Sequence, residues 1–342
     1  MTDIEGTTRY EVEEPVATTG FWRRALAGWL RADSSWTLIA ALIVAIVLAV
    51  TNPDFATVSN LTNVLLQSCV VAFMALGQTF VIIGGGIDLS MAGVLALSGV
   101  LGADTLVRGE VIFIGILLML AVGTAFGSFN GIAVAKVKMT PFIVTLSTLV
   151  LTTGIAAMYT QGVTIGPVMK DFRRMGSASG FAIPIPVLLV AAAAVLAYFL
   201  LQRTAYGRML YATGTNALAA RSSGIPTEKI IFSTYLIGGL AAAMAGMTLV
   251  ARLGTGSSGM GGDLLILDAI SAVIIGGASL KGGRGTIMGT LAGVLLISLI
   301  SNGLNLFGVS YFLTIIVKGV VIFLAVLLDA WRTRAVFGGA EA

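Results

Sequence analysis

Residues 84–90, which read GGGIDLS, hold the groups in this sequence that are best suited to chemistry. They place Asp88 and Ser90 directly after three glycines, between two apolar runs. A carboxylate at membrane depth is costly enough to need a structural or functional reason. Asp88 either caps the next helix, with Ser90 in its first turn, or takes a direct part in a gate or pathway. A phosphate loop is excluded, because the Gly-Lys-Ser/Thr ending that binds phosphate and metal is missing.

A second glycine pattern, GTGSSG at residues 254–259, matches the GxGxxG fingerprint of dinucleotide-binding proteins letter for letter. That fingerprint needs a preceding strand and a βαβ unit, whereas here it follows an apolar helix. We therefore interpret the stretch as a flexible outer loop that could dock an extracytoplasmic partner. The chain also has no histidine and a single cysteine, Cys69. The commonest acid/base group and metal ligand are thus missing, as is any disulfide framework. We assign no catalytic, cofactor-binding or metal site.

Lys318 lies in the middle of the last long apolar run. Ionisable groups inside membranes face the protein interior, so a pair with Asp268 or Asp88 would lessen the cost, and a contact with substrate is the alternative. Uncharged amides such as those of Gln78 and Asn130 suit a polyhydroxylated solute, and they suit hydrogen bonds between helices equally well. The gate or pathway candidates are Gly85, Asp88, Ser90, Gln78, Asn130 and Lys318.

The composition identifies the class of protein that must position these groups. Of 342 residues, 57% are hydrophobic and only 11% are charged, and the mean hydropathy is +1.00. One soluble globule could not hide so much apolar surface, so the chain is an integral membrane protein. Its 43 glycines suit the close helix packing that bilayers favour.

Apolar length gives the number of spans, since a helix needs about 20 residues to cross a bilayer. We expect an all-α protein of about ten spans, near residues 36–50, 60–83, 89–106, 111–135, 142–160, 184–202, 230–251, 267–280, 286–303 and 310–329. The third and eighth, which are interrupted by glycine or short, are expected to be broken helices. The transmembrane domain thus covers residues 36–330, between an N-terminal tail, 1–35, and a C-terminal tail, 331–342.

Lysine and arginine favour the cytoplasmic side of a membrane and therefore test this topology. With the N-terminus inside, the inner segments contain Arg9, Arg23, Arg24, Arg31, Lys136, Lys138, Arg203, Arg208, Arg221, Lys229, Lys281, Arg284, Arg332 and Arg334. The outer segments contain only Arg108, Lys170, Arg173, Arg174 and Arg252. Both termini and residues 203–229 are therefore expected in the cytoplasm. The net charge of +4 is a topology signal and gives no case for nucleic acid.

The pentapeptide VIIGG occurs twice, at residues 81–85 and 273–277, each time at the inner end of an outward-to-inward span. Transporters are often built from repeats. Five residues from so apolar an alphabet also match by chance, so a true repeat and a coincidence both stay open.

Residues 203–229 form a polar island between two apolar runs. Asn216 can cap a short helix over 217–223, Gly224 fits the left-handed position after it, and Pro226 prevents its continuation. A helix of two turns is marginal in water by itself, so we infer that a partner protein holds it. The alternative is an ordinary connecting loop with a capped turn.

Four segments together resemble a known family. They are GGGIDLSMAGVLALSG (84–99), YGRMLYATGTNALAARSSGI (206–225), IIGGASLKGGRGTIMGTLAGVLLI (274–297) and VKGVVIFLAVLLD (317–329). In this order they look like the membrane permease subunits of bacterial ATP-binding-cassette importers for monosaccharides, the ribose and xylose type. The resemblance extends over about residues 36–330.

The resemblance implies a ten-span subunit of the bacterial inner membrane, surrounded by lipid. Two such permeases, either identical or homologous, form the pathway. A pair of cytoplasmic ATPase subunits uses the ATP, so the permease itself needs no cofactor, and a periplasmic sugar-binding protein delivers the solute. It also implies that the ATPase-coupling segment contains Gly207, Gly214, Asn216, Ala219, Ala220, Gly224 and Ile225.

Three other classes of protein remain to be weighed. Branched-chain amino acid permeases share a GGxxDLS-like segment and are the nearest relatives to confuse with sugar permeases. An ion-coupled secondary sugar transporter would carry carboxylates near the midplane, where these spans offer few. A membrane enzyme would need a nucleophile with a base or a metal cluster, and none can be assembled here. The sugar itself is not readable, because specificity in such systems resides largely in the separate binding protein.

Overall fold

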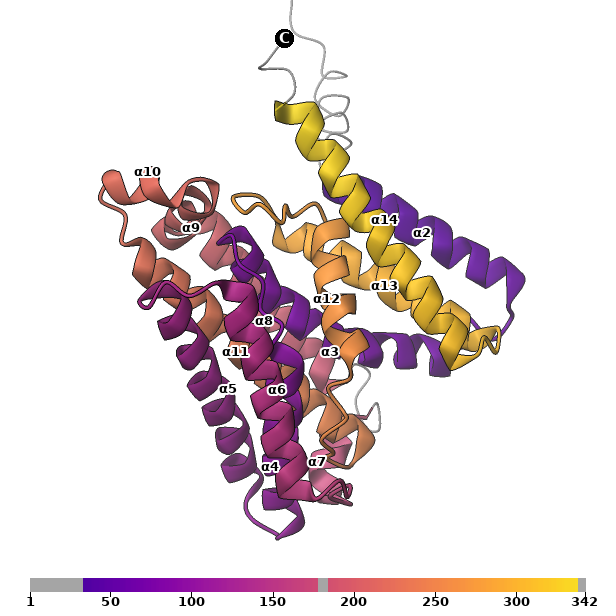
Figure 1. The fold of residues 1–342 in the computed structure, drawn as a ribbon. Helices are drawn as coiled ribbons and strands as arrows, with labels where there is room; N and C mark the ends of the chain where they lie inside the picture. Colours follow the sequence, from indigo (N-terminus) through magenta and orange to yellow (C-terminus); the bar gives the residue numbers. More distant parts are fainter. Residues whose placement is uncertain (1–32, 178–183, 338–342) are drawn as a thin grey trace, which may run out of the picture.

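The computed structural model describes residues 33–177 and 184–337, and these residues form helices joined by short connections (Figure 1). The helices are α2 (Asp33–Thr51), α3 (Val58–Ile83), α4 (Met91–Val107), α5 (Ile112–Ala135), α6 (Pro141–Thr160), α7 (Lys170–Met175), α8 (Ile185–Arg203), α9 (Ala205–Thr215), α10 (Ala217–Ser222), α11 (Thr227–Leu253), α12 (Asp263–Ile275), α13 (Ile287–Leu306) and α14 (Tyr311–Phe337). In this part of the chain the only β pairing is an isolated bridge between Ile165 and Gly256. The all-α prediction is confirmed for these residues, whereas residues 1–32 of the predicted N-terminal tail and 338–342 of the predicted C-terminal tail lie outside them.

Six helices are long and apolar enough to cross a membrane, namely α3, α5, α6, α8, α11 and α13. Four shorter apolar helices occupy α2, α4, α12 and the first part of α14. Together these helices lie where the ten spans were predicted. The number of actual crossings and the side on which the termini lie remain predictions.

The third and eighth predicted spans are not broken helices, so that prediction is wrong. α4 is a continuous helix of 17 residues, and α12 is a continuous helix of 13. The glycines inside α4 keep a helical backbone, whereas Gly85 and Gly277, in the connections after α3 and α12, have φ angles of 84° and 96°. This left-handed backbone is easy for glycine and strained for other residues, so the glycines end the preceding helices instead of interrupting the spans.

The two VIIGG pentapeptides also share a backbone structure. After α3, Gly86 N–H donates a hydrogen bond of 2.9 Å to Val81 C=O, and after α12, Ala278 N–H donates one of 3.1 Å to Val273 C=O. Both closures are the six-residue Schellman type that caps helix C-termini. The sequence echo is therefore a repeated helix ending, and it places two helix ends in matching conformations.

Glycine brings α5 and α11 into direct backbone contact at the centre of the bundle. A Cβ atom placed at Gly127 would lie 2.6 Å from the carbonyl oxygen of Tyr235, and one placed at Gly239 would lie 2.8 Å from Gly127 Cα. Gly123 also meets Gly239 across this interface. Small residues allow such approach in a bilayer, where packing and not hydrophobic burial drives helix association. This confirms the expected use of glycine for close helix packing.

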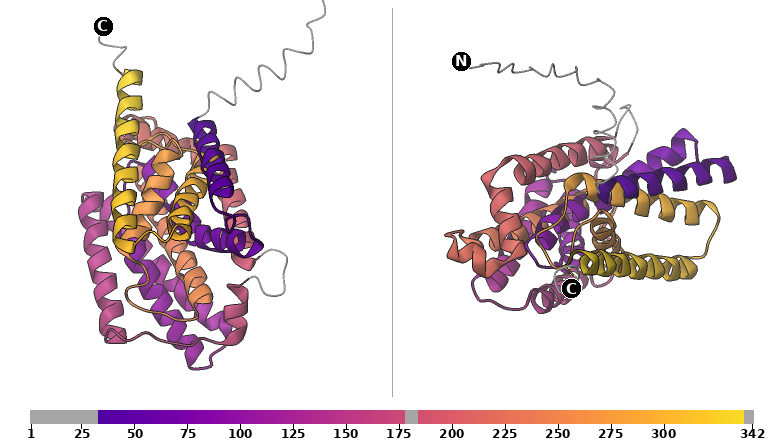
Figure 2. Two further views of the ribbon diagram at one scale, coloured as in Figure 1. Left: turned by 90° about the vertical axis from the view of Figure 1, so that its right-hand side faces the viewer. Right: turned by 90° about the horizontal axis from the view of Figure 1, so that it is seen from above.

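The remaining helices surround this pair unevenly. The largest apolar core joins α3, α4, α11, α12 and α13 and begins in α3 at Val70. Cys69, the residue before it, is also buried. α2 packs against α13, and α14 packs against α12, so these helices gather at one side of the bundle (Figure 2). That arrangement leaves apolar faces of α2 and α14 exposed, as expected for surfaces that meet lipid.

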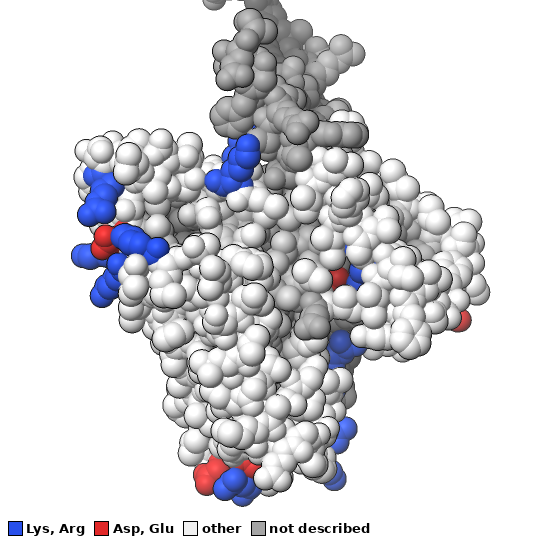
Figure 3. Space-filling view, in the orientation of Figure 1, with Lys and Arg blue, Asp and Glu red and all other residues white. Residues whose placement is uncertain are grey.

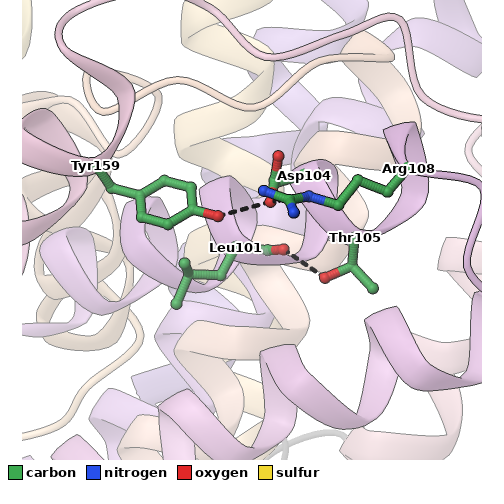
Figure 4. Close-up of polar contacts among 5 residues, drawn as sticks. All are labelled: Leu101, Asp104, Thr105, Arg108 and Tyr159. Carbon is green, nitrogen blue, oxygen red and sulfur yellow. Dashed lines mark hydrogen bonds and ion pairs between the residues drawn. The ribbon is translucent and has the colours of Figure 1, made fainter.

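The charged residues gather at the two ends of the molecule. α9, α10 and the C-terminal end of α14 lie at one end, and α7 and the turn between α4 and α5 lie at the other (Figure 1). Lysine and arginine cluster beside α10, and a mixed acidic and basic group covers the far end (Figure 3). At that far end, Asp104 accepts hydrogen bonds from Tyr159 (2.6 Å) and Arg108 (2.8 Å), which ties α4 to α6 (Figure 4). The wide apolar surface between the two ends is the part that suits the bilayer.

We expect Gly127→Val to destabilise the chain, because the larger side chain would push α5 away from the backbone of α11. An overpacked interface costs roughly 2 kcal/mol. Thermal unfolding of the purified protein in detergent measures the change. Gly154→Val is the matched control, since Gly154 also lies in a helix and has nothing within 4 Å of its Cβ position. Equal melting temperatures for the two variants would contradict the packing argument.

Candidate functional site

The segment 203–229 contains two successive helices, α9 and α10. Asn216 connects them: its side-chain oxygen accepts hydrogen bonds from the N–H groups of Leu218 (3.1 Å) and Ala219 (3.0 Å). This is the N-cap that the sequence predicts, and it satisfies donors that the first turn of a helix leaves without partners.

The end of α10 also forms as predicted. Gly224 has a φ angle of 83°, Ile225 N–H donates to Ala220 C=O at 3.0 Å, and Gly224 N–H donates to Arg221 C=O at 3.0 Å. α10 ends at Ser222, one residue before the predicted boundary. The sequence-derived helix is therefore confirmed in place and capping, and it is one residue shorter than predicted.

α9 was not predicted as a helix. It begins after Thr204, whose hydroxyl oxygen accepts a hydrogen bond of 3.4 Å from Gly207 N–H. Gly207 lies so close to the end of α8 that a Cβ atom there would be 2.7 Å from Leu201 Cα. The sequence Thr-Ala-Tyr-Gly at residues 204–207 thus makes a sharp turn between α8 and α9. Only glycine at position 207 allows the two helices to approach so closely.

The predicted coupling residues differ in exposure. Asn216, Ala219 and Gly224 are exposed, Gly214 and Ile225 are half-buried, and Gly207 and Ala220 are buried. The exposed set lies on α10 or at its ends, whereas the buried pair shapes the fold beneath it. Leu218, at the tip of α10, is 79% exposed. The helix therefore offers an exposed apolar side chain to a partner, and the sequence analysis did not single out this residue.

Glu228 holds the base of α10. Its carboxylate lies 3.0 Å from Lys138 Nζ and 3.7 Å from a guanidinium nitrogen of Arg221. These ion pairs connect α10, the start of α11 and the turn between α5 and α6. Each exposed pair contributes little stability alone, but together they restrict the direction in which α10 points.

α9 is fixed against the membrane helices by its apolar face. Leu210 is fully buried among residues of α3 and α8. The Tyr206 hydroxyl lies 2.9 Å from the Ser233 hydroxyl of α11, and burial raises the pKa of this tyrosine. Its ring packs against Phe80 at a centroid distance of 6.4 Å. A displacement of α9 would therefore reach α3, α8 and α11 directly.

Asp88 does not cap α4 in the way the sequence suggested. The helix begins at Met91, with Ser90 in the cap position and without a side-chain capping bond. Asp88 Oδ1 instead accepts hydrogen bonds from Ser90 N–H (2.9 Å) and from the Ser90 hydroxyl (2.5 Å). The carboxylate closes a local turn that ends at Ser90, directly before the helix, because Asp88 lies three residues before Met91, the first helical residue.

Three other pathway candidates, Gln78, Ser90 and Asn130, join Asp88 in one buried cluster. Asn130 Nδ2 donates to the Ser90 hydroxyl at 2.8 Å, and its Oδ1 accepts from Thr148 at 2.6 Å. The Gln78 amide, oriented to satisfy both groups, pairs with the backbone N–H and C=O of Asp88 at 3.2 Å each. The cluster thus ties α3, α4, α5 and α6 together around the loop that also contains Gly85. These side chains are almost fully buried, so contact with a solute would require the helices to separate.

The other carboxylate oxygen of Asp88 and the Tyr235 hydroxyl are buried without a hydrogen-bond partner. Gly238 of α11 packs against this carboxylate: a Cβ atom at Gly238 would lie 3.3 Å from Asp88 Oδ2. Unsatisfied buried polar groups are rare in native structures. Of the four buried side-chain atoms without a hydrogen-bond partner in the part of the chain that the structure describes, two therefore lie at this cluster.

Lys318 lies apart from this cluster and forms the predicted ion pair with Asp268. Its Nζ is 2.6 Å from Asp268 Oδ2, and only 14% and 8% of the two side chains are exposed. The pair joins α14 to α12, which is the helix that α14 contacts most. The predicted structural pairing is confirmed, with Asp268 and not Asp88 as the partner.

The end of the molecule opposite α10 contains a basic hollow of about 300 Å³. Its lining residues are Lys170, Arg173, Arg174, Ser177, Ala251 and Arg252. The GTGSSG loop begins beside it, after a helix and not a strand, as predicted. Two hydrogen bonds of 2.8 Å between Gly256 and Ile165 fix part of this loop, so its first half is less free than the sequence suggested.

Comparison with known proteins gives one consistent family. The sequence pattern of the family described as the permease component of branched-chain amino acid transport systems matches residues 60–326. The ribose import permease of Bacillus subtilis (strain 168) is 41% identical over 293 residues, which cover 85% of this chain and 91% of the relative. The D-allose and L-arabinose transport system permeases of Escherichia coli (strain K12) are 36% and 32% identical, covering 85% and 89% of this chain and 89% and 92% of theirs. No solved structure matches.

We expect Lys318→Met to be strongly destabilising, because it leaves the buried Asp268 carboxylate without its partner. Breaking a buried ion pair costs about 3 kcal/mol or more, whereas removing both charges is far less harmful. The combination with Asp268→Asn should therefore recover most of the lost stability in a thermal unfolding assay. Lys229→Met, at an exposed lysine, is the control. A double variant as unstable as the single one would show that charge pairing is not the reason.

We expect Asp88→Asn and Asp88→Ala to differ in stability. The amide keeps an oxygen that accepts from Ser90, whereas alanine leaves two buried donors without an acceptor. Each buried donor left without a partner costs roughly 1–3 kcal/mol. Unfolding of the two variants, compared with Ser98→Ala as a buried control outside the cluster, measures this. Equal losses in both Asp88 variants would mean that the charge itself is required.

Proposed function

The chain belongs to the family of transport-system permease components, and on this basis we propose that it carries a monosaccharide of the ribose type inward across the bacterial inner membrane. Members of this family are transport proteins and not enzymes, and they are multi-pass proteins of the inner membrane. The energy for transport comes from a partner ATPase in the cytoplasm, which hydrolyses ATP and drives alternating access.

The choice of sugar over amino acid is supported by the relatives. The family description refers to branched-chain amino acids, but the relatives compared here are named for ribose, allose and arabinose. An amino acid would require groups for its ammonium and its carboxylate. Of the charged residues deep in the bundle, Lys318 and Asp268 already neutralise each other. The identity is higher to the ribose permease than to the allose and arabinose permeases, which favours ribose among these three sugars.

The observation that carries the energy source is α10, a capped six-residue helix that presents Leu218 to the surroundings. So short a helix is not stable by itself, which indicates that a partner binds it. That partner would bury the apolar side chain of Leu218, and the basic residues near α10 would attract it electrostatically. The chain would thus take up the motion of the ATPase pair at α10. At the other end of the molecule, the basic hollow is the surface that we assign to the periplasmic sugar-binding protein. A second permease copy completes the complex.

Sugar uptake by the complete transporter tests this proposal. Vesicles that contain the permease, its ATPase and its binding protein should accumulate labelled ribose only when ATP is supplied to the ATPase side. Ionophores that dissipate proton and sodium gradients should leave the rate unchanged. Uptake that stops with ionophores but survives ATP depletion would identify an ion-coupled transporter instead.

Substitution of Leu218 tests the contact itself. Leu218→Ser should reduce co-purification of the ATPase and lower ATP-driven uptake by about tenfold, the range of one buried leucine at an interface. Leu253→Ser is the control, because Leu253 is also exposed, at 54%, but lies at the end of α11 away from α10. Unchanged ATPase binding by Leu218→Ser would contradict the assignment of α10.

A further inference from the structure

Three segments that are far apart in the sequence meet at the C-terminal end of α9. They contribute Gly85, which follows α3, Gly214 of α9, and Gly282 and Gly283, which lie between α12 and α13. We call these four residues the glycine junction. Neither the resemblance nor the comparisons assign a role to the α12–α13 connection.

The contacts in the glycine junction are between backbones. Gly283 N–H donates a hydrogen bond of 2.9 Å to Ile83 C=O, which joins the connection after α12 to the last residue of α3. Gly214 lies directly on this hydrogen bond: a Cβ atom there would be 2.7 Å from Gly283 N and would also overlap the Ile83 carbonyl. From the other side, a Cβ atom at Gly282 would be 2.7 Å from Gly214 C=O and 2.9 Å from Gly85 Cα.

The four glycines are needed for different reasons. Gly85, Gly282 and Gly283 have φ angles of 84°, 86° and 71°, so their backbone conformation favours glycine. Gly214 lies in a regular helix, and only the close approach of its neighbours excludes a side chain. Because backbones meet here without flexible side chains between them, a displacement of α9 must move the ends of α3 and α12 with it.

A second contact reinforces this link one turn earlier on α9. The Tyr211 hydroxyl donates a hydrogen bond of 2.7 Å to Gly285 C=O, at the end of the same connection. Burial raises the pKa of Tyr211, so the phenol keeps its proton and remains a donor at neutral pH. Two contacts on successive turns fix both the position and the rotation of α9 relative to the α12–α13 connection.

α9 and α10 are joined so tightly that they move as one unit. Asn216 N–H donates to Ala212 C=O at 3.1 Å, which closes α9, and Asn216 C=O accepts from Ala220 N–H at 2.9 Å, which opens α10. Its side chain caps α10 as well. No flexible linker therefore separates the exposed helix from the glycine junction.

We propose that Gly214 is the positioning residue that transmits movement of α10 to the matched ends of α3 and α12, with Tyr211 as its second contact. This proposal rests on the function proposed above and identifies the part of the chain through which ATP-driven motion enters the bundle. The C-terminal ends of α3 and α12 have the same VIIGG cap, so movement of the glycine junction would displace two helix ends of matching conformation together. Asp88 lies three residues beyond Gly85, so the buried polar cluster is the next part of the bundle to receive the movement.

The experiment compares coupling in the complete transporter. The Gly214→Ala permease should still bind the ATPase, because α10 is unchanged. The ATPase in that complex should still hydrolyse ATP. The number of ATP molecules consumed per sugar transported should rise about tenfold, which is within the usual range of coupling between sites. Gly154→Ala, in α6 and without neighbours near its Cβ position, is the matched control and should behave as wild type.

Tyr211→Phe provides a second, milder variant in case Gly214→Ala fails to assemble. It removes one partly buried hydrogen bond and keeps the ring, so it should assemble and raise the ATP cost per sugar by about threefold to fivefold, near the lower end of the same range. An unchanged ATP cost in Tyr211→Phe and in any assembled Gly214→Ala would overturn the proposal. So would a proportional loss of hydrolysis and uptake, because that indicates a merely structural role. If the wild-type complex itself shows no ATP-driven uptake, the proposed function fails, and this outcome is distinct from a failure of the glycine junction.

Discussion

Helices in a bilayer gain little from hiding apolar side chains, because the lipid around them is equally apolar. Direct contact between backbones has to supply part of what burial supplies in water, and in this chain glycine makes such contact possible. The α5–α11 interface depends on Gly127 and Gly239, and the meeting of α9 with two other segments depends on Gly214. The same constraint thus holds the centre of the bundle together and connects the bundle to its exposed helix.

Polar groups inside the bundle are accommodated in two ways. Lys318 and Asp268 neutralise each other, which attaches α14 to α12 and leaves this pair without net charge. Asp88 has no cation partner among its described contacts and relies on Ser90 and the Gln78 amide, with one carboxylate oxygen left unsatisfied. An ion pair is a stable arrangement that rarely needs to change, whereas an incompletely satisfied cluster has alternative partners available once the helices shift. The second region is therefore better suited to a protein that changes conformation.

The sequence was informative where structure is decided locally. The cap at Asn216, the left-handed Gly224 and the approximate helix positions follow from neighbouring residues, and the Lys318–Asp268 pair follows from the cost of a lone charge in a membrane. The helix α9 was missed because its amphipathic face becomes apparent only against α3 and α8. The hydrogen bond between Asn130 and Ser90 and the close contacts of Gly214 could not be predicted either, since they join segments that are 40 or more residues apart in the chain. Glycine letters alone do not tell which backbone will approach them.

The solitary thiol of this chain has a practical consequence. Cys69 is enclosed in α3, out of reach of reagents in water. Fluorophores or spin labels can therefore be attached at introduced cysteines without first replacing Cys69. One label at an exposed position of α10 and another near α7 would lie at opposite ends of the molecule. The distance between them would report movement along the transport axis.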